Sequence, residues 1–151
     1  MQTFLPYASF KQSAQVLDNK RLGKQRVEAY QVIRALCGES KGWVHHPATV
    51  MWRGYENFLC KYGAVMCIEW MNRGFKDSLL TQFLDYYEFF DEIKPWWYDY
   101  EPLHISHQSN LYRKDPVHYS MFADAPRDLP YVWCETPNTY HLGTNREVVY
   151  I

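Results

Sequence analysis

Helical periodicity, interrupted by glycine and proline, is the feature that most constrains what this chain can fold into. Over residues 19–37 the apolar side chains recur on one side of a helix that turns by about 100° per residue. Asp18 precedes this segment where a side-chain oxygen can cap a helix, and Gly38 follows it where helices commonly end. The pattern predicts an amphipathic helix of about five turns.

The rest of the chain shows the same period in shorter stretches. We expect helices at residues 46–73, with a break or kink at Gly54, at about 76–93, and at about 106–114. The tail from Ala123 contains three prolines and few periodic runs, so we expect extended chain that wraps the helices, with a short strand at residues 147–151. No internal repeat or long linker divides the chain, and we therefore expect one compact all-α domain over residues 1–151.

The net charge of −1 hides an uneven distribution of charge along the chain. Residues 1–75 hold 10 Lys and Arg against 5 Asp and Glu, whereas residues 76–151 hold 6 against 12. This distribution excludes a uniformly basic, histone-like DNA-binding protein. It is compatible with a basic half that faces an anionic ligand.

Membrane, export and metal signals are weak. No apolar run reaches the roughly 18–20 residues of a membrane span, and the N-terminus lacks the pattern of a signal peptide. The four cysteines form no Cys-x-x-Cys pair, and the i, i+3 spacing of His104 and His107 is by itself a weak signal for a metal site. We expect a cytoplasmic monomer, associated with the nucleoid or in the host cytoplasm if the source is a virus, that uses no metal and no cofactor.

The helix predicted at residues 19–37 carries the most informative polar face. On a helical wheel, Arg21 and Lys24 lie within about 40° of Glu28, and Gln25 and Gln31 flank it at about 60°. A single carboxylate inside a rim of cations and amides suits one task. The cations can hold an anionic substrate while the acid transfers a proton or stabilises a positive charge that develops beside it.

A structural interpretation of the same face stays open. The charges could form a solvated surface on which Glu28 merely neutralises Lys24. Arg26 projects onto the apolar side, where a buried guanidinium needs a partner. It is therefore either half of a structural ion pair or part of a site.

Several sequence motifs resemble one family of repair enzymes. The run LDNKRLGKQRVE at residues 17–28 resembles the first long helix of the phage-type pyrimidine-dimer DNA glycosylases, the endonuclease V kind of excision enzyme. The run HPAT at residues 46–49 and the run from RGYENF to NRGF at residues 53–75 resemble that family's central helix at matching spacing. The run SNLYRK at residues 109–114 is a weaker match to its C-terminal DNA-contacting helix.

The resemblance implies a mechanism. Family members kink duplex DNA, flip a nucleotide and cleave the N-glycosidic bond of a damaged pyrimidine. The N-terminal α-amine attacks C1′, an imine forms, and β-elimination nicks the strand. A glutamate on the first helix is essential, and Glu28 is its counterpart here. Such a carboxylate stabilises the positive charge at the sugar, while Arg21 and Lys24 can hold phosphates.

The sequence also departs from the family pattern. The family places an Arg just before its glutamate and another three residues after it, where this chain has Val27 and Gln31. The family's nucleophile is the amine of a small second residue, but residue 2 here is Gln, a bulky side chain that usually leaves Met1 in place. The amine would then belong to Met1, or the enzyme is a monofunctional glycosylase that uses water. The stretch before the helix is also about five residues longer.

The remaining candidates are polar residues outside the first helix. His45 and His46 precede a helix start, where free N–H groups could bind phosphate. His107 could contact DNA or substrate, and Asn110 and Lys114 fall on family contact positions.

Taken together, the sequence predicts a glycosylase that acts on a damaged pyrimidine in double-stranded DNA, with Glu28 and Met1 as catalytic residues. The residues expected to bind substrate or DNA are Gln2, Arg21, Lys24, Gln25, Arg26, Gln31, His45, His46, His107, Asn110 and Lys114. The alternatives are a glycosylase for another modified base, or a non-catalytic protein that binds DNA or a nucleotide on the same scaffold.

Overall fold

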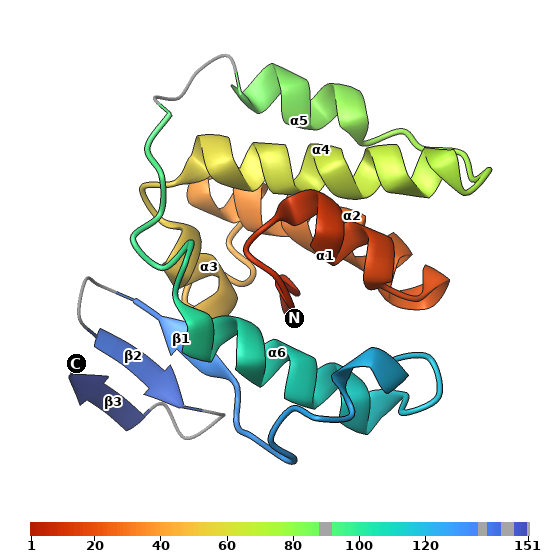
Figure 1. Cartoon of the computed structure of the whole chain (residues 1–151). Coiled ribbons are helices and arrows are strands. Elements are labelled where there is room, and N and C mark those ends of the chain that lie inside the picture. The colour runs from red at the N-terminus through yellow and green to blue at the C-terminus, as the bar shows by residue number, and fades with distance from the viewer. Residues whose placement is uncertain (88–91, 136–138, 143–146, 151) are drawn as a thin grey trace.

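A computed structural model describes residues 1–87, 92–135, 139–142 and 147–150. Within these residues the chain forms six α-helices, one 3-10 helix and three strands (Figure 1). The elements are α1 Phe10–Val16, α2 Asn19–Leu36, α3 Pro47–Trp52, α4 Glu56–Asn72, α5 Leu80–Tyr87, α6 Glu101–Lys114, η1 Ser120–Phe122, β1 Val132–Cys134, β2 Thr139–Leu142 and β3 Glu147–Tyr150. The protein is mostly helical, which confirms the all-α class.

The helix α2 has the boundaries that its sequence predicts. The Asp18 side chain accepts a hydrogen bond from the backbone N–H of Arg21, which satisfies a donor of the first turn. Gly38 has a φ of 76°, the left-handed conformation that glycine adopts without strain after a helix end. The predicted break at Gly54 is also found, since it separates α3 from α4.

The helices lie in layers on two sides of the N-terminal segment. Figure 1 shows α5, α4 and the pair α1 and α2 on one side, and α6 on the other. Helix α4 packs against α1, α2 and α5. The close approach of α5 depends on Gly63, because a Cβ there would lie 2.3 Å from the Phe83 ring. Figure 1 also places the chain's first residues inside the molecule, between α6 and the other helices.

The C-terminal segment forms a small antiparallel sheet in the order β1-β2-β3. Val132 pairs with Leu142, and Thr139 pairs with Tyr150. The strand β1 contacts α3 and α6, so the sheet lies at one edge of the helical body. The strand expected at the C-terminus is present as β3, with residue 151 outside the described residues.

Other boundaries differ from those expected. Helix α5 begins later than position 76 because Asp77 occupies the turn before it and accepts hydrogen bonds from the N–H groups of Leu79 and Leu80. Residues 88–91 of that expected helix lie outside the described residues. Helix α6 begins earlier, at Glu101, and α1 was not expected.

Candidate active site

The first seven residues are fixed by side chains of the helices around them. The backbone N–H groups of Phe4 and Leu5 donate to Gln25 Oε1 and His107 Nδ1, each at 2.8 Å. The carbonyl of Pro6 accepts from Gln108 Nε2 at 2.7 Å. An irregular segment cannot pair its own buried polar groups, so these side chains supply the partners. The start of the chain therefore has a defined position in the fold.

Glu28 lies where this segment begins. Its Oε2 accepts hydrogen bonds from the backbone N–H of Gln2 at 3.3 Å and from Gln25 Nε2 at 3.0 Å. Gln25 is buried, and its own Oε1 is 2.6 Å from the Tyr62 hydroxyl. Burial and the charge of Glu28 raise the pKa of Tyr62, which keeps this hydroxyl protonated as a donor. The carboxylate is thus oriented by a buried amide that cannot easily turn.

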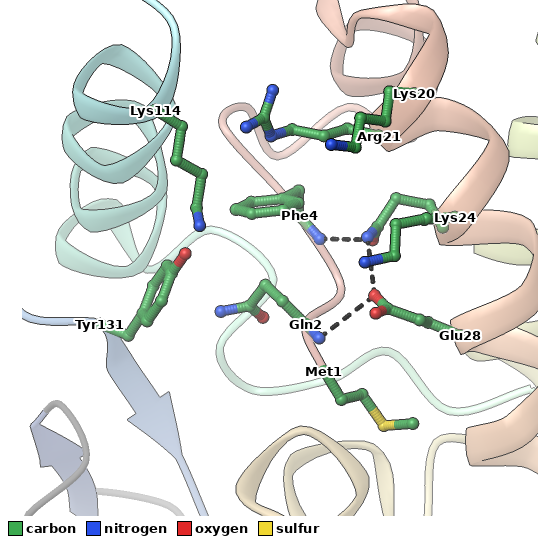
Figure 2. A pocket seen from close by; sticks show the side chains of 10 residues that line it. Met1, Gln2, Phe4, Lys20, Arg21, Lys24, Glu28, Lys114 and Tyr131 are labelled. Atoms are coloured by element: carbon green, nitrogen blue, oxygen red, sulfur yellow. Dashed lines mark hydrogen bonds between the residues drawn. The ribbon is translucent and has the colours of Figure 1, made fainter.

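A pocket of about 370 Å³ opens beside Glu28. Figure 2 shows its two walls, α2 on one side and α6 with the segment before β1 on the other. The residues that line it are Met1, Gln2, Phe4, Lys20, Arg21, Lys24, Gln25, Glu28, Lys114 and Tyr131. Seven of the residues predicted from the sequence come together here, namely Met1, Gln2, Arg21, Lys24, Gln25, Glu28 and Lys114.

The pocket carries an excess of positive charge. Arg21 is paired with Asp18 at 3.1 Å. In the described part of the chain, no carboxylate lies within ion-pair distance of Lys20, Lys24 or Lys114. Three lysines around one carboxylate leave a net positive charge, which suits an anionic ligand such as a phosphate backbone.

Arg26 does not line this pocket and forms an ion pair. Its Nε donates to Asp77 Oδ1 at 2.8 Å, and its guanidinium lies over the Trp70 ring at 5.0 Å. Of the two interpretations that the sequence left open, the ion pair is the one observed. Arg26 and Gln31 border a second hollow on the outer side of Glu28.

His45 and His46 lie at the start of α3 and do not line the pocket. The His46 side chain caps that helix, since its Nδ1 accepts from the Ala48 N–H at 3.0 Å. His45 is exposed. The free N–H group expected for phosphate at Ala48 is therefore already used.

His107, expected to contact DNA or substrate, and Asn110, expected at a family contact position, do not line the pocket, and both side chains are buried. Burial lowers the pKa of His107 to about 3, with a smaller effect of the charge of His104, so the ring is neutral and can accept from Leu5. The Asn110 amide donates to the carbonyls of Ser106 at 2.7 Å and Leu129 at 3.0 Å. In this structure both side chains bond to the backbone of the segments around the pocket.

Three residues that line the pocket were not among the site residues predicted from the sequence. Lys20 stands four residues before Lys24 and could have been found on the same helical wheel. Phe4 and Tyr131 carry no local signal, because tertiary packing alone places them. Burial raises the pKa of Tyr131 to about 12, so its hydroxyl stays protonated at the pocket wall.

No group of three or more His, Cys, Asp or Glu among the described residues could hold a metal ion. None of the described helices is long and apolar enough to cross a membrane.

A family model described as pyrimidine dimer DNA glycosylase matches residues 1–82. The chain belongs to this family. The matched part contains the N-terminal segment, Glu28 and the cations of α2, whereas Lys114 and Tyr131 of this glycosylase-family chain lie beyond it. Comparison with curated proteins and with solved structures gives no match.

Proposed function

We propose that this protein excises a damaged pyrimidine from double-stranded DNA by cleaving its N-glycosidic bond, with a pyrimidine dimer as the substrate. The observation that carries the proposal is the placement of Glu28. A carboxylate of the family-matched helix stands beside the fixed start of the chain, in a pocket lined by three lysines that form no ion pair with the described residues.

The proposed chemistry follows from these charges. Breaking the N-glycosidic bond leaves positive charge on the deoxyribose, and a carboxylate at van der Waals distance lowers the energy of that state. Glu28 is held by the Gln25 amide and so needs no reorganisation during the reaction. Lys20, Arg21 and Lys24 would bind the phosphates on either side of the damaged nucleotide.

Two fates of the sugar are compatible with this arrangement. In the first, the N-terminal α-amine, which is the family's nucleophile and here would belong to Met1, forms an imine with C1′, and β-elimination nicks the strand. Alternatively, water hydrolyses the bond and the product is an intact strand with an abasic site. The first makes the protein an AP lyase as well as a glycosylase, and the second makes it a monofunctional glycosylase.

The test is a panel of duplexes that contain a pyrimidine dimer, other damaged pyrimidines or modified bases, scored for base release and for strand nicking. We expect release from the dimer duplex and none from an undamaged duplex. Base release only from a duplex with a modified base would show that this base, and not the pyrimidine dimer, is the substrate. Salt-dependent binding without release from any duplex would contradict the proposal and leave a DNA-binding protein.

A further inference from the structure

One polar side chain of the pocket is buried and carries a donor with no acceptor. Gln2 lines the pocket, yet only 6% of the residue is exposed. Its Oε1 accepts from the Thr3 N–H at 2.8 Å, which fixes the orientation of the amide, and among the described residues no acceptor bonds to its Nε2. Folded proteins nearly always pair a buried donor, because an unpaired one is costly. We therefore expect the missing acceptor on the ligand that the pocket takes.

The same residue is tied to the candidate catalytic carboxylate. The backbone N–H of Gln2 donates to Glu28 Oε2 at 3.3 Å. Figure 2 shows the Gln2 side chain extending from this point across the pocket, toward the wall formed by Lys114 and Tyr131. In a nucleotide the base is joined directly to C1′ of the sugar. A base whose C1′ lies beside Glu28 therefore comes within reach of the Gln2 amide.

The other donors of the pocket are less suited to hold a base. The Gln25 amide is already bonded through both its nitrogen and its oxygen. The lysines of the pocket are exposed, long and charged, which suits phosphates more than a neutral carbonyl group. The Tyr131 hydroxyl lies on the wall opposite Glu28. Among the described residues that line the pocket, Gln2 is the one whose unpaired donor is buried and fixed relative to the carboxylate.

We propose that the Gln2 side-chain amide donates a hydrogen bond to O2 of the damaged pyrimidine and stabilises the negative charge of the leaving base. The proposal rests on the proposed function, because it adds a second substrate contact to the same reaction. It uses only the side chain of Gln2 and leaves the nucleophile of the family unchanged.

The charges of the proposed reaction explain why a donor is useful at this place. As the bond between C1′ and N1 breaks, its electron pair stays with N1 and spreads over the adjoining carbonyl group to O2. Glu28 stabilises the positive charge left on the sugar, and the Gln2 amide stabilises the negative charge at O2. The nucleophile then adds to C1′ and loses a proton, and the base takes up a proton, so atoms and charge balance. The amide itself keeps its protons throughout.

A base reaches the amide once one side chain moves. Gln2 Nε2 is covered in this structure, and Lys114 directs its side chain into the space in front of Gln2 (Figure 2). Lysine carries its charge on a long flexible stem, so Lys114 can turn towards a phosphate and uncover the amide. The arrival of the phosphate backbone thus opens the contact to the base.

The test is the single-turnover rate of base release from a dimer-containing duplex at saturating protein. Gln2→Glu keeps an oxygen for the Thr3 N–H but has no side-chain donor when ionised, and Gln2→Met has neither the donor nor the added charge. Both variants should release base about 100-fold more slowly than the wild type, which is the loss typical of one such donor. Gln12→Met, at an exposed position of α1 outside the pocket, should match the wild type.

Two further readouts separate this role from a structural one. The affinity for a duplex with a tetrahydrofuran abasic analogue should be the same for the wild type and Gln2→Met, because this duplex has no base at the site. A dimer made from 5-fluorouracil should leave more readily than a thymine dimer, since fluorine withdraws charge from the ring. The ratio of the wild-type rate to the Gln2→Met rate should therefore be smaller for the fluorinated dimer.

The outcomes distinguish this proposal from the proposed function. A wild-type rate in either Gln2 variant, or equal rate ratios for the two dimers, would overturn the assignment of Gln2. Weaker binding of the abasic-analogue duplex by Gln2→Met would show a structural role in its place. In each of these cases the wild type still releases base, so the glycosylase proposal stands. No base release by the wild type would contradict both proposals.

Discussion

Two polar residues, Gln25 and His107, have structural roles that their residue types alone do not predict. Gln25 lies on the polar face of α2, yet it is buried and links the start of the chain to Glu28. The ring of His107 is neutral, and its Nδ1 accepts a hydrogen bond from the backbone N–H of Leu5 in the N-terminal segment. Both side chains fix the position of residue 2 relative to the carboxylate. The site therefore depends on buried polar residues as much as on the exposed cations.

His107 should make the stability of the protein depend on pH. Its pKa is about 3 when folded and 6.5 in the reference state, so between these values the unfolded chain binds more protons. The contribution is complete above about pH 6.5 and is lost as the pH falls towards 3. We expect the free energy of unfolding, measured with urea, to fall between pH 7 and pH 5.

Two variants distinguish the effect of His107 on the pH dependence of stability from the effects of other titrating groups. Asn in place of His107 can still accept from Leu5 but does not titrate, so His107→Asn should flatten the pH dependence in that range. His45→Asn, at an exposed position, should leave it unchanged. An unaltered slope in His107→Asn would contradict the role given to this ring.

At the scale of elements, the turn between α4 and α5 is organised by one carboxylate. Asp77 accepts from Arg26 on α2 and from the N–H groups of Leu79 and Leu80 at the start of α5. Burial alone would raise the pKa of Asp77, but the hydrogen bonds from Leu80 and Arg26 hold it below its ordinary value. One side chain thus joins α2 to the first turn of α5.

Asp77→Ala should therefore destabilise the fold strongly. The change leaves the largely buried Arg26 guanidinium without its partner, and the loss of one partner of a buried pair costs about 3–5 kcal/mol. Urea unfolding measures the difference. The double variant Asp77→Ala/Arg26→Met should recover part of it, because the unpaired charge is then absent. A loss below about 1 kcal/mol in Asp77→Ala would show that the pair contributes little.

Elements with local signals could be predicted, and elements that depend on tertiary contacts could not. Helix α2 has a cap, a continuous apolar stripe and a terminal glycine within one segment, so its boundaries follow from the sequence. Helix α1 and the strands β1 and β2 are short, and packing against other elements decides them. The same limit applies to the site. The wheel of α2 grouped Glu28 with its cations, but the burial of Asn110 is a property of the whole fold.

The sequence has a basic half, residues 1–75, and an acidic half, residues 76–151, and most residues that line the pocket belong to the basic half. The lysines of α2 and Lys114 gather around a single opening, so we expect the duplex to approach across the N-terminal half of α2. Acidic residues are concentrated after position 75 and would repel phosphates elsewhere. The overall charge of −1 is the sum of a basic N-terminal half and an acidic C-terminal half of the sequence.

This orientation predicts which lysines contribute to DNA binding. If Lys24 neutralises one phosphate, Lys24→Gln should reduce the slope of log affinity against log salt by about 0.9. Lys94→Gln is the control, since Lys94 pairs with Asp99 and does not line the pocket. When binding is measured from low to moderate salt, the Lys94→Gln variant should show the same slope of log affinity against log salt as the wild type. Equal slopes for all three proteins would place the duplex on another surface.

In the proposed reaction, Glu28 is the carboxylate that drives base release. Glu28→Gln keeps an oxygen that can accept from Gln2 and Gln25, so the variant should fold and bind DNA. The decisive measurement is the single-turnover rate of base release from a dimer-containing duplex for the wild type and this variant, with Glu101→Gln as an exposed control. The rate should be lower by about 100- to 10,000-fold for Glu28→Gln alone. A Glu28→Gln rate equal to that of the wild type would contradict it.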